Sequence, residues 1–414
     1  MSDQRDGQVK FRDVFRVGEF RALWSALVLS IVGDQLARVA LALLVFARTD
    51  SAALTALTYA LTFLPDIVGG PLLSGLADRF PRREVMVVAD LSRAGLVALM
   101  AIPGMPLALV CVLLVMVQLL ASPFNAARGA VLPSMLVGDS FVAGQAVVNI
   151  TYQTGQLFGY VTGGVLVEFT GPYVALLIDA GTFIASALLV RFGTASRPAS
   201  RNAEPVSHAK ATIASLRAGT DLVWHDRNLR ALVGLACICG FYVIGEGLAV
   251  PYAHELGGGA LTAGLLFAAF PFGNALGMVA LLRLVPQQGR LRLLGPLAVA
   301  ACAVLIVCLA HPNLVGTLIV LALSGAAASH QTVAAAAFVS AVPDSSRGQA
   351  YGLANTSIRV AQGLGVVLAG LAAETLPPSM VVGFFGGIGV LVALAAAAAY
   401  HRSRNVVSTA PVEA

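Results

Sequence analysis

Hydrophobic segments of about twenty residues recur along the chain from Phe20 to Tyr400, with short polar gaps between them. A helix that crosses a bilayer needs about 20 consecutive, mainly apolar residues. The pattern therefore predicts an all-α membrane protein of about twelve spanning helices. The expected spans are residues 20–47, 52–77, 84–103, 106–127, 141–168, 173–192, 229–250, 260–283, 293–311, 314–340, 350–373 and 380–400.

The polar gaps alternate between basic gaps and gaps with almost no basic residue. Arg79, Arg82 and Arg83 follow the second span, and Arg290 and Arg292 follow the eighth. No Lys or Arg occurs in the gaps around Gly104, Gly171, Gly257, Pro312 and Pro377. Cytoplasmic loops of membrane proteins carry the excess of Lys and Arg. We therefore expect a multi-pass protein of the cell membrane with both termini and the middle loop in the cytoplasm.

Composition agrees with a membrane protein. Hydrophobic residues make up 58% of the 414 residues and charged residues only 11%, whereas a soluble protein has roughly 25% charged residues. The net charge of +5 is explained by cytoplasmic loops that face lipid headgroups, so no nucleic-acid partner is expected. The first nineteen residues are polar and charged, so we expect no cleavable signal peptide there.

The sequence indicates no catalytic, metal or cofactor chemistry. All five cysteines lie in apolar spans, and Cys237 and Cys239 point about 200° apart on a helix. The two lysines, Lys10 and Lys210, are followed by Phe and Ala, whereas a phosphate-binding loop needs Lys followed by Ser or Thr. We therefore expect no enzyme, no disulfide framework and no ATP-driven pump.

The chain also repeats itself at a nearly constant shift. Asn149 and Gln156 align with Asn355 and Gln362, a shift of 206, and Glu168 aligns in the same way with Glu374. Two parallel halves imply two bundles with a binding site between them near mid-membrane. The expected organisation is an N-terminal segment 1–19, a six-helix bundle 20–192, a central loop 193–228, a second six-helix bundle 229–400 and a tail 401–414.

The gap after the second span resembles a signature of the major facilitator superfamily. It contains Gly75, Asp78, Arg79, Arg82 and Arg83, although Pro81 stands where the family usually has glycine. The resemblance covers nearly the whole chain and implies the two-bundle transporter fold. It also implies that Asp78 and the arginines form a cytoplasmic gate latch, with Asp78 facing the start of the eleventh span.

The fifth span is similar to the signature of the superfamily's antiporters. Its glycines are Gly155, Gly159, Gly163 and Gly164, and Tyr160 stands where the family usually has proline. Spacing of four places the first three of these glycines on one face, so another helix can approach closely. The close approach would serve either plain helix packing or a seal against proton leak. The segments FRALW, Gly33-Asp34 and Asn125-Ala-Ala-Arg128 resemble the macrolide-efflux and siderophore-exporter branch.

Charged side chains deep in the spans are the candidate functional residues, because each is costly in a bilayer unless it is paired or hydrated. Asp34 lies near the middle of the first span, and Arg38 shares its face four residues later, so an ion pair between them is feasible. We expect Asp34 to exchange protons with the cavity, and Asp90 and Arg93 to form a structural bridge. The full set of proton-coupling or cavity candidates is Asp34, Arg38, Asp66, Glu246, Arg359 and His330.

A proton-coupled transporter that expels a hydrophobic or amphiphilic small molecule, such as an antibiotic, is the expected function. Its partners would be the substrate, protons and membrane lipid, and it would act as a monomer. The polar side chains expected to line the cavity are Gln118, Asn149, Tyr152, Gln153 and Gln156. The alternatives are a narrow-specificity siderophore or metabolite exporter, a proton-driven importer, and a non-transporting sensor on the same scaffold.

Overall fold

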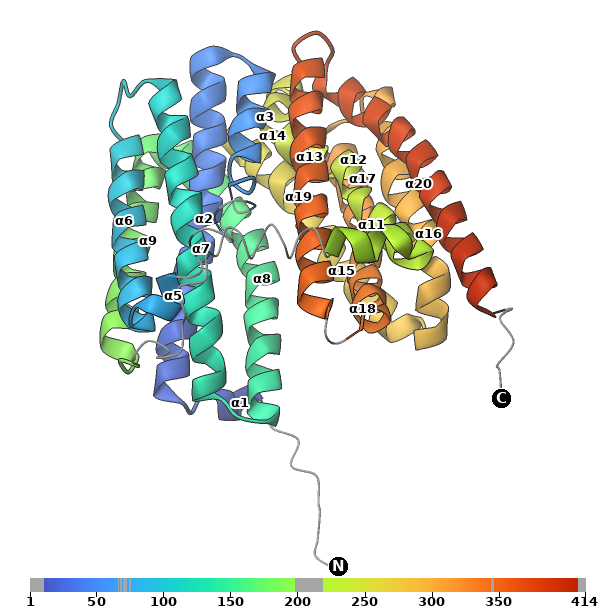
Figure 1. Ribbon diagram of the computed structural model, residues 1–414. Helices are drawn as coiled ribbons and strands as arrows, with labels where there is room; N and C mark the ends of the chain where they lie inside the picture. The colour runs from blue at the N-terminus through green and yellow to red at the C-terminus, as the bar shows by residue number, and fades with distance from the viewer. Residues whose placement is uncertain are drawn as a thin grey trace, which may run out of the picture.

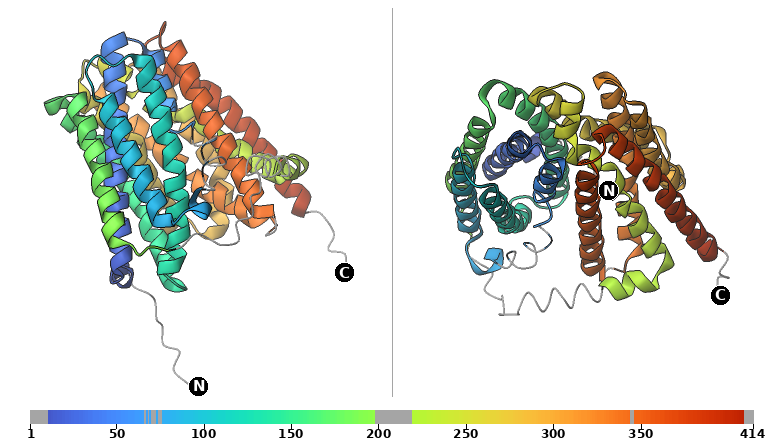
Figure 2. Two further views of the ribbon diagram at one scale, coloured as in Figure 1. Left: turned by 60° about the vertical axis from the view of Figure 1, so that its left-hand side comes forward. Right: turned by 90° about the horizontal axis from the view of Figure 1, so that it is seen from above.

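The computed structural model describes residues 11–65, 67, 69, 73, 76–197, 219–343 and 346–408. Within these residues the chain is helical and contains no strand. Helices α1 to α9 form one group and α11 to α20 form a second group beside it (Figure 1). The two groups also lie side by side when the molecule is viewed from above (Figure 2, right). The predicted all-α fold of two helical bundles is confirmed.

The first group, called the N-bundle here, contains the short helices α1 and α5 and six longer ones. Their bounds are α1 Phe11–Val14, α2 Gly18–Thr49, α3 Ala52–Ala60, α5 Leu76–Arg79, α6 Arg82–Met100, α7 Leu107–Met135, α8 Asp139–Thr170 and α9 Pro172–Gly193.

The second group, called the C-bundle, is more interrupted. Its bounds are α11 Arg227–Cys237, α12 Cys239–Tyr242, α13 Ile244–Gly247, α14 Ala249–Glu255, α15 Ala260–Leu284, α16 Gln287–Ala303, the 3₁₀-helix η1 Val304–Ala310, α17 Leu314–Ala328, α18 His330–Ala341, α19 Arg347–Ala372 and α20 Pro378–Ser408.

Eight helical stretches of the described chain are long and apolar enough to cross a membrane. Helices α6, α8 and α19 have 19, 32 and 26 residues and carry more polar side chains. The predicted crossing at residues 52–77 begins with α3, and the residues between α3 and α5 are only partly described. These segments together correspond to the twelve predicted spans.

Chain reversals at one end of the bundles follow from local sequence. Asp50 ends α2 in the left-handed region with φ of 49°, and Ser51 then caps α3 by accepting a hydrogen bond from Leu54 N over 3.1 Å. Gly171 separates α8 from α9 with φ of 79°, which favours glycine. We call this end of the bundles the far end. The opposite end, at the bottom of the N-bundle in Figure 1 where α2 begins, is called the terminal end.

The two bundles contact each other at the far end through α8 with α15 and through α3 with α19. Gly164 of α8 faces Gly264 of α15 so closely that a Cβ atom added to Gly164 would lie 2.8 Å from the Cα of Gly264. Glu168 accepts a hydrogen bond from Leu261 N over 3.1 Å at the start of α15. The far end is therefore closed by direct contact between the bundles.

The span that contains Glu246 is broken into short helices rather than continuous. It turns at Ile238, Val243 and Leu248, between α11 and α14. Gly240 allows α19 to approach, since an added Cβ would lie 2.5 Å from the carbonyl oxygen of Ala361. Irregular backbone at membrane depth is tolerated where it is buried in protein or lines a cavity.

Candidate functional site: a cavity between the bundles

A central cavity of about 370 Å³ lies between the two bundles. Both bundles contribute to its wall, which fits a binding site at the interface of two repeats. The residues that line it are Arg38, Tyr59, Phe63, Gln153, Gln156, Tyr242, Val243, Glu246, Phe270, Pro271, Asn274, Ala328, Gln331, Thr332, Arg359 and Gln362.

Glu246 is the acidic residue of this wall, and its hydrogen bonds cross between the bundles. The hydroxyl of Tyr59 on α3 donates to its Oε2 atom, and the hydroxyl of Tyr160 on α8 lies 3.5 Å from the same oxygen. Glu246 is only 5% exposed. A buried carboxylate is stable only with hydrogen bonds or a counter-charge, and here tyrosines of the N-bundle supply the hydrogen bonds to a residue of the C-bundle.

Arg38 brings a positive charge to the same wall from α2. Its Nη1 atom donates to Gln35 Oε1 over 3.0 Å and to the hydroxyl of Tyr160 over 3.2 Å. Tyr160 therefore links Arg38 of the N-bundle to Glu246 of the C-bundle. A change in the charge of Glu246 would therefore alter the hydrogen bonding of Tyr160, which is also the partner of Arg38.

Aromatic rings hold this cluster in place. Phe267 of α15 stacks on the ring of Tyr160 with centroids 5.1 Å apart and lies 5.9 Å from the ring of Tyr59. Such contacts add roughly 0.5–1.5 kcal/mol beyond the burial of area. The stacking fixes the two phenol groups relative to Glu246.

The cavity wall also combines a second cation with amides and aromatic rings. The guanidinium carbon of Arg359 lies 6.0 Å from the centre of the Phe63 ring. Tyr242 stacks on Phe270 with ring centroids 5.4 Å apart, and Gln331 donates to the carbonyl oxygen of Ala236 over 3.1 Å. The cavity thus offers two cations, one carboxylate, amides and flat apolar surfaces.

The structure brings together five of the predicted site residues. Arg38, Glu246, Arg359, Gln153 and Gln156 all line the central cavity. Their roles in proton coupling or substrate binding stay predictions.

Other predicted residues lie elsewhere. Gln118 is half-buried and does not line the central cavity, and Asn149 and Tyr152 line a separate pocket. His330 is fully buried, and its Nδ1 atom lies 3.0 Å from the carbonyl oxygen of Ala327. The ring of Tyr242, which lines the cavity, lies edge-on to the ring of His330 with centroids 6.5 Å apart.

The predicted pairing of Asp34 with Arg38 is wrong. Asp34 Oδ1 accepts a hydrogen bond from Arg93 Nη2 over 2.8 Å, and the other nitrogen of that guanidinium lies 3.6 Å from Asp90. Spacing along one helix showed that Asp34 and Arg38 share a side, but Arg93 approaches from α6, 59 residues away. Arg38 is held instead by Tyr160.

This charge cluster lies within the N-bundle between α2, α6 and α9. Arg93 and Asp90 are fully buried, Ser186 donates to Asp90 over 2.5 Å, and Arg93 lies 4.0 Å from the centre of the Phe183 ring. The pairing of Asp90 with Arg93 is as expected. Asp34 is not among the residues that line the central cavity, and its expected role in proton exchange is untested.

The glycines of the fifth span show close helix packing. An added Cβ at Gly155 would lie 2.8 Å from Ile31 Cγ2, one at Gly159 2.7 Å from Gln35 Cβ, and one at Gly163 3.1 Å from Leu36 Cα. These three glycines therefore admit α2, whereas Gly164 points the other way and admits α15 of the C-bundle.

The predicted gate signature is only partly visible. Gly75 and Asp66 lie outside the described residues, as does the side chain of Asp78. Arg79 is exposed, Arg82 donates to the carbonyl oxygen of Ala130 over 2.9 Å, and Arg83 donates to that of Thr194 over 3.4 Å. Two of the predicted arginines thus tie the start of α6 to α7 and to the end of α9.

Sequence reasoning missed Tyr59, Tyr242 and Gln362 as cavity residues. A signal existed for Gln362, because the repeat aligns it with Gln156 and both line the cavity. No sequence pattern distinguished Tyr59 or Tyr242 from aromatic residues of a packed core. Within the described residues, no group of three or more His, Cys, Asp or Glu side chains could hold a metal ion.

Comparison with protein families assigns this architecture. The family model described as Major Facilitator Superfamily matches residues 23–313 and 231–412. The chain has two helical bundles around a central polar cavity and matches this model over most of its length. By class it is a membrane transporter. The chain belongs to the Major Facilitator Superfamily.

Curated relatives agree with this class but match only part of the chain. The uncharacterized MFS-type transporter YfiS of Bacillus subtilis (strain 168) is 30% identical over 129 residues, which is 31% of either chain. The uncharacterized MFS-type transporter YvqJ of the same organism is 26% identical over 227 residues, which is 54% of this chain and 53% of the relative.

Solved structures share the fold over nearly the whole length. The nucleoside transporter NupG has a TM-score of 0.72 at 13% identity and covers 92% of this chain and 99% of its own. A bacterial homolog of the human lysosomal transporter Spinster, in an inward-facing and occupied conformation, has a TM-score of 0.70 at 14% identity and covers 95% and 98%. At these identities the likeness shows the fold alone.

Proposed function

We propose that this protein exchanges protons for a small amphiphilic molecule across the cell membrane by alternating access at the central cavity, with Glu246 as the proton-carrying group. The observation that carries the proposal is the link from Glu246 to Tyr59 and Tyr160, because it joins the two bundles through one carboxylate. Rocking of one bundle against the other would break and remake this link.

Glu246 suits proton coupling better than Asp34. Asp34 already has a strong partner in Arg93, inside a single bundle. Glu246 has only phenol groups as hydrogen-bond partners among the described residues, and it borders the space that a substrate would fill. Water that enters the cavity favours the ionised carboxylate, and a dry cavity favours the protonated form.

The cavity wall supports an amphiphilic substrate. Phe63, Phe270 and Tyr242 offer flat apolar surface, while Arg38 and Arg359 offer donors to acceptor groups of a ligand. Pockets for small molecules combine such apolar walls with few polar groups. An antibiotic or another natural product with polar groups on an apolar frame fits this chemistry.

Export as a monomer, with both termini in the cytoplasm, remains part of the proposal. The closed far end supports it, since the central cavity would then be loaded from the terminal, cytoplasmic end. One pH unit supplies about 1.4 kcal/mol per proton, enough for a tenfold substrate gradient. A narrow-specificity siderophore exporter would use the same cavity and differ only in its ligand range.

Purified protein in liposomes tests this function. We expect an imposed proton gradient to drive labelled amphiphile against its own gradient, in the direction opposite to the protons. Movement of substrate together with protons would identify an importer. If no solute in a broad panel moves under the gradient, the transporter proposal is wrong and a sensor role replaces it.

A further inference from the structure

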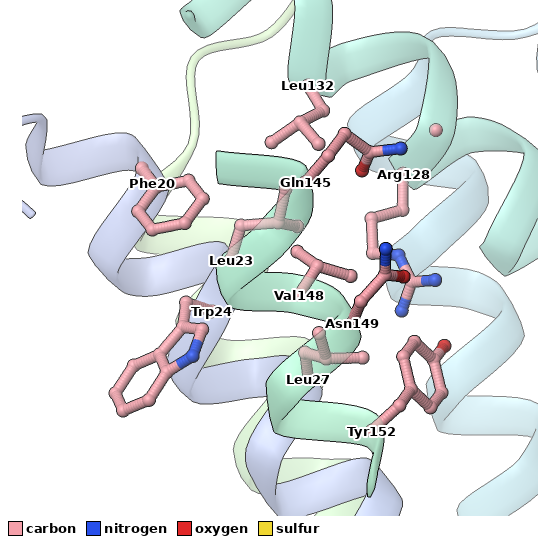
Figure 3. A pocket seen from close by; sticks show the side chains of 11 residues that line it. Phe20, Leu23, Trp24, Leu27, Arg128, Leu132, Gln145, Val148, Asn149 and Tyr152 are labelled. Carbon is pink, nitrogen blue, oxygen red and sulfur yellow. The ribbon is translucent and has the colours of Figure 1, made fainter. Parts of the chain in front are cut away.

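A second pocket lies wholly within the N-bundle, between α2, α7 and α8 (Figure 3). Its volume is about 200 Å³, below the range of about 300–1,000 Å³ typical of sites for whole drug-sized ligands. We call it the N-bundle pocket. It is lined by Phe20, Leu23, Trp24, Leu27, Arg128, Gly129, Leu132, Gln145, Val148, Asn149 and Tyr152.

Arg128 is the charged residue of this pocket, and its hydrogen-bonding capacity is not used up. Its guanidinium carbon lies 5.3 Å from the centre of the Tyr152 ring. Its Nη1 atom is buried and has no hydrogen-bond partner. None of the ion pairs found among the described side chains involves Arg128. A guanidinium has five N–H donors and no acceptor, so an acceptor is missing from this wall.

Further polar groups come from one face of α8. Gln145, Asn149 and Tyr152 are spaced by four and three residues, which places them in one row along the helix. Figure 3 shows Arg128 reaching from α7 toward Asn149 and Tyr152. The next residue of the same row, Gln156, lines the central cavity, so the row leads from one site to the other.

The repeat provides an internal control. The C-bundle has its own pocket of about 120 Å³ between the equivalent helices, and it includes Leu232, Val233, Phe338 and Asn355. These residues correspond to Leu23 and Trp24 at a shift of 209, and to Leu132 and Asn149 at a shift of 206. Both bundles therefore form the same hollow.

The two hollows differ in charge. At the shift of 206, Arg128 corresponds to Ala334 and Tyr152 to Ile358, both of which line the C-bundle pocket. The hollow forms without a cation in the C-bundle. Packing of the hollow alone thus does not require an arginine at position 128, whereas a ligand with negative charge would explain its presence.

We propose that the N-bundle pocket binds the anionic headgroup of an amphiphile, a phosphate or carboxylate that carries an apolar chain. Arg128 would bind the anion, because a guanidinium fork matches the geometry of these groups. The amides of Gln145 and Asn149 would complete the hydrogen bonds, and Phe20, Leu23 and Leu27 would contact the chain. The headgroup could belong to a membrane lipid or to a dissolved amphiphile.

The two tryptophans of the chain allow a direct measurement. Trp24 lines the pocket, whereas Trp224 is 68% exposed and distant in sequence. In a Trp224→Phe background, Trp24 becomes the only tryptophan. Dodecyl phosphate is titrated into the full-length protein in a neutral detergent while the Trp24 emission is followed. We expect a saturable change, and no saturable change with dodecyltrimethylammonium.

Arg128→Ala makes the pocket resemble its C-bundle counterpart and should weaken dodecyl phosphate binding at least tenfold, while Arg128→Lys, which keeps the charge but loses the fork, should weaken it less. Arg191→Ala is the matched control, because it removes the same charge from an exposed position on α9. Thermal unfolding curves check that each variant is folded. Equal affinities of Arg128→Ala and the parent protein, or no saturable change in the parent, would overturn the proposal.

A second arm identifies the source of the headgroup. The protein is reconstituted in phosphatidylcholine vesicles that contain brominated phosphatidylglycerol, whose bromine quenches nearby tryptophan. Quenching of Trp24 that weakens in Arg128→Ala identifies membrane lipid as the occupant. Binding of dodecyl phosphate without such quenching identifies a dissolved amphiphile instead. Both results support an anion site, and neither depends on transport through the central cavity.

Discussion

The carboxylate of Glu374, at the end of α19, accepts a hydrogen bond over 2.7 Å from the hydroxyl of Ser51, which caps α3 in the opposite bundle. It also accepts one from Ala53 N over 2.8 Å. Glu168 makes the equivalent contact with Leu261 N at the start of α15. The start of a helix carries free N–H groups and partial positive charge. Two acidic residues related by the repeat therefore hold the far end closed.

Glu374→Gln should weaken this closure and populate a conformation that is open at the far end. Spin labels can be placed at Phe169 and Val315, which are exposed on different bundles. Double electron–electron resonance between them should then show a distribution shifted to longer distances. Glu255→Gln is the matched control, because among the described residues the Glu255 carboxylate contacts Ser379 and His311 of its own bundle. An unchanged distance in Glu374→Gln would show that the contact does not restrain the bundles.

The same contact predicts a pH dependence. The hydrogen bonds from Ala53 N and the Ser51 hydroxyl lower the pKa of Glu374 below its ordinary value. Stabilisation by such a group is complete above the ordinary glutamate pKa of about 4.3 and is lost as the pH falls through the lowered pKa. The far-end distance should therefore be constant from pH 7 to about pH 5 and increase at lower pH. In Glu374→Gln the contribution of this site to that increase should be absent.

Gly164→Leu should disrupt the crossing of α8 and α15. The added side chain would meet the backbone of Ala260 and Gly264, both within 2.8 Å of an ideal Cβ, and overpacking of this kind costs about 1–3 kcal/mol. We expect slower transport and the same far-end opening in distance measurements. Gly181→Leu is the control, because nothing lies within 4 Å of its added Cβ. An unchanged far-end distance in Gly164→Leu would mean that α8 and α15 accommodate the leucine side chain without cost, and it would contradict the expected overpacking.

Arg93→Ala should destabilise the N-bundle. It would leave Asp90 buried without its counter-charge and Asp34 without its 2.8 Å partner, and removal of one member of a buried ion pair costs about 3–5 kcal/mol. Thermal unfolding in detergent would measure the loss. Arg359→Ala removes an arginine that forms no ion pair with a carboxylate among the described residues and should lower the unfolding temperature far less. Similar unfolding temperatures for the two variants would contradict a structural role for Arg93.

The sequence was sufficient for features that follow from local composition and from the repeat. Span lengths predicted the all-α fold, and the repeat aligned Gln156 with Gln362, although Gln362 was not predicted as a cavity residue. It was insufficient where a contact joins distant helices. The i, i+4 spacing gave Asp34 a neighbour on its own helix, but the bond to Arg93 depends on how α6 packs beside α2.

Tyr160 shows a further limit of sequence reasoning. In the sequence it stands out only as a departure from the proline of the antiporter signature. In the structure its hydroxyl lies between Arg38 and Glu246, and its ring stacks on Phe267. These partners come from three other helices, so no pattern within α8 could reveal them.

The comparison of uphill transport with exchange in Glu246→Gln tests the central claim most directly. The amide keeps the size of the side chain and can still accept from Tyr59, but it cannot exchange a proton. We predict that liposomes with Glu246→Gln exchange labelled for unlabelled substrate at a rate within about threefold of the parent but accumulate none under an imposed pH gradient, whereas Asp34→Asn accumulates substrate. Accumulation by Glu246→Gln as strong as that of the parent would contradict the account.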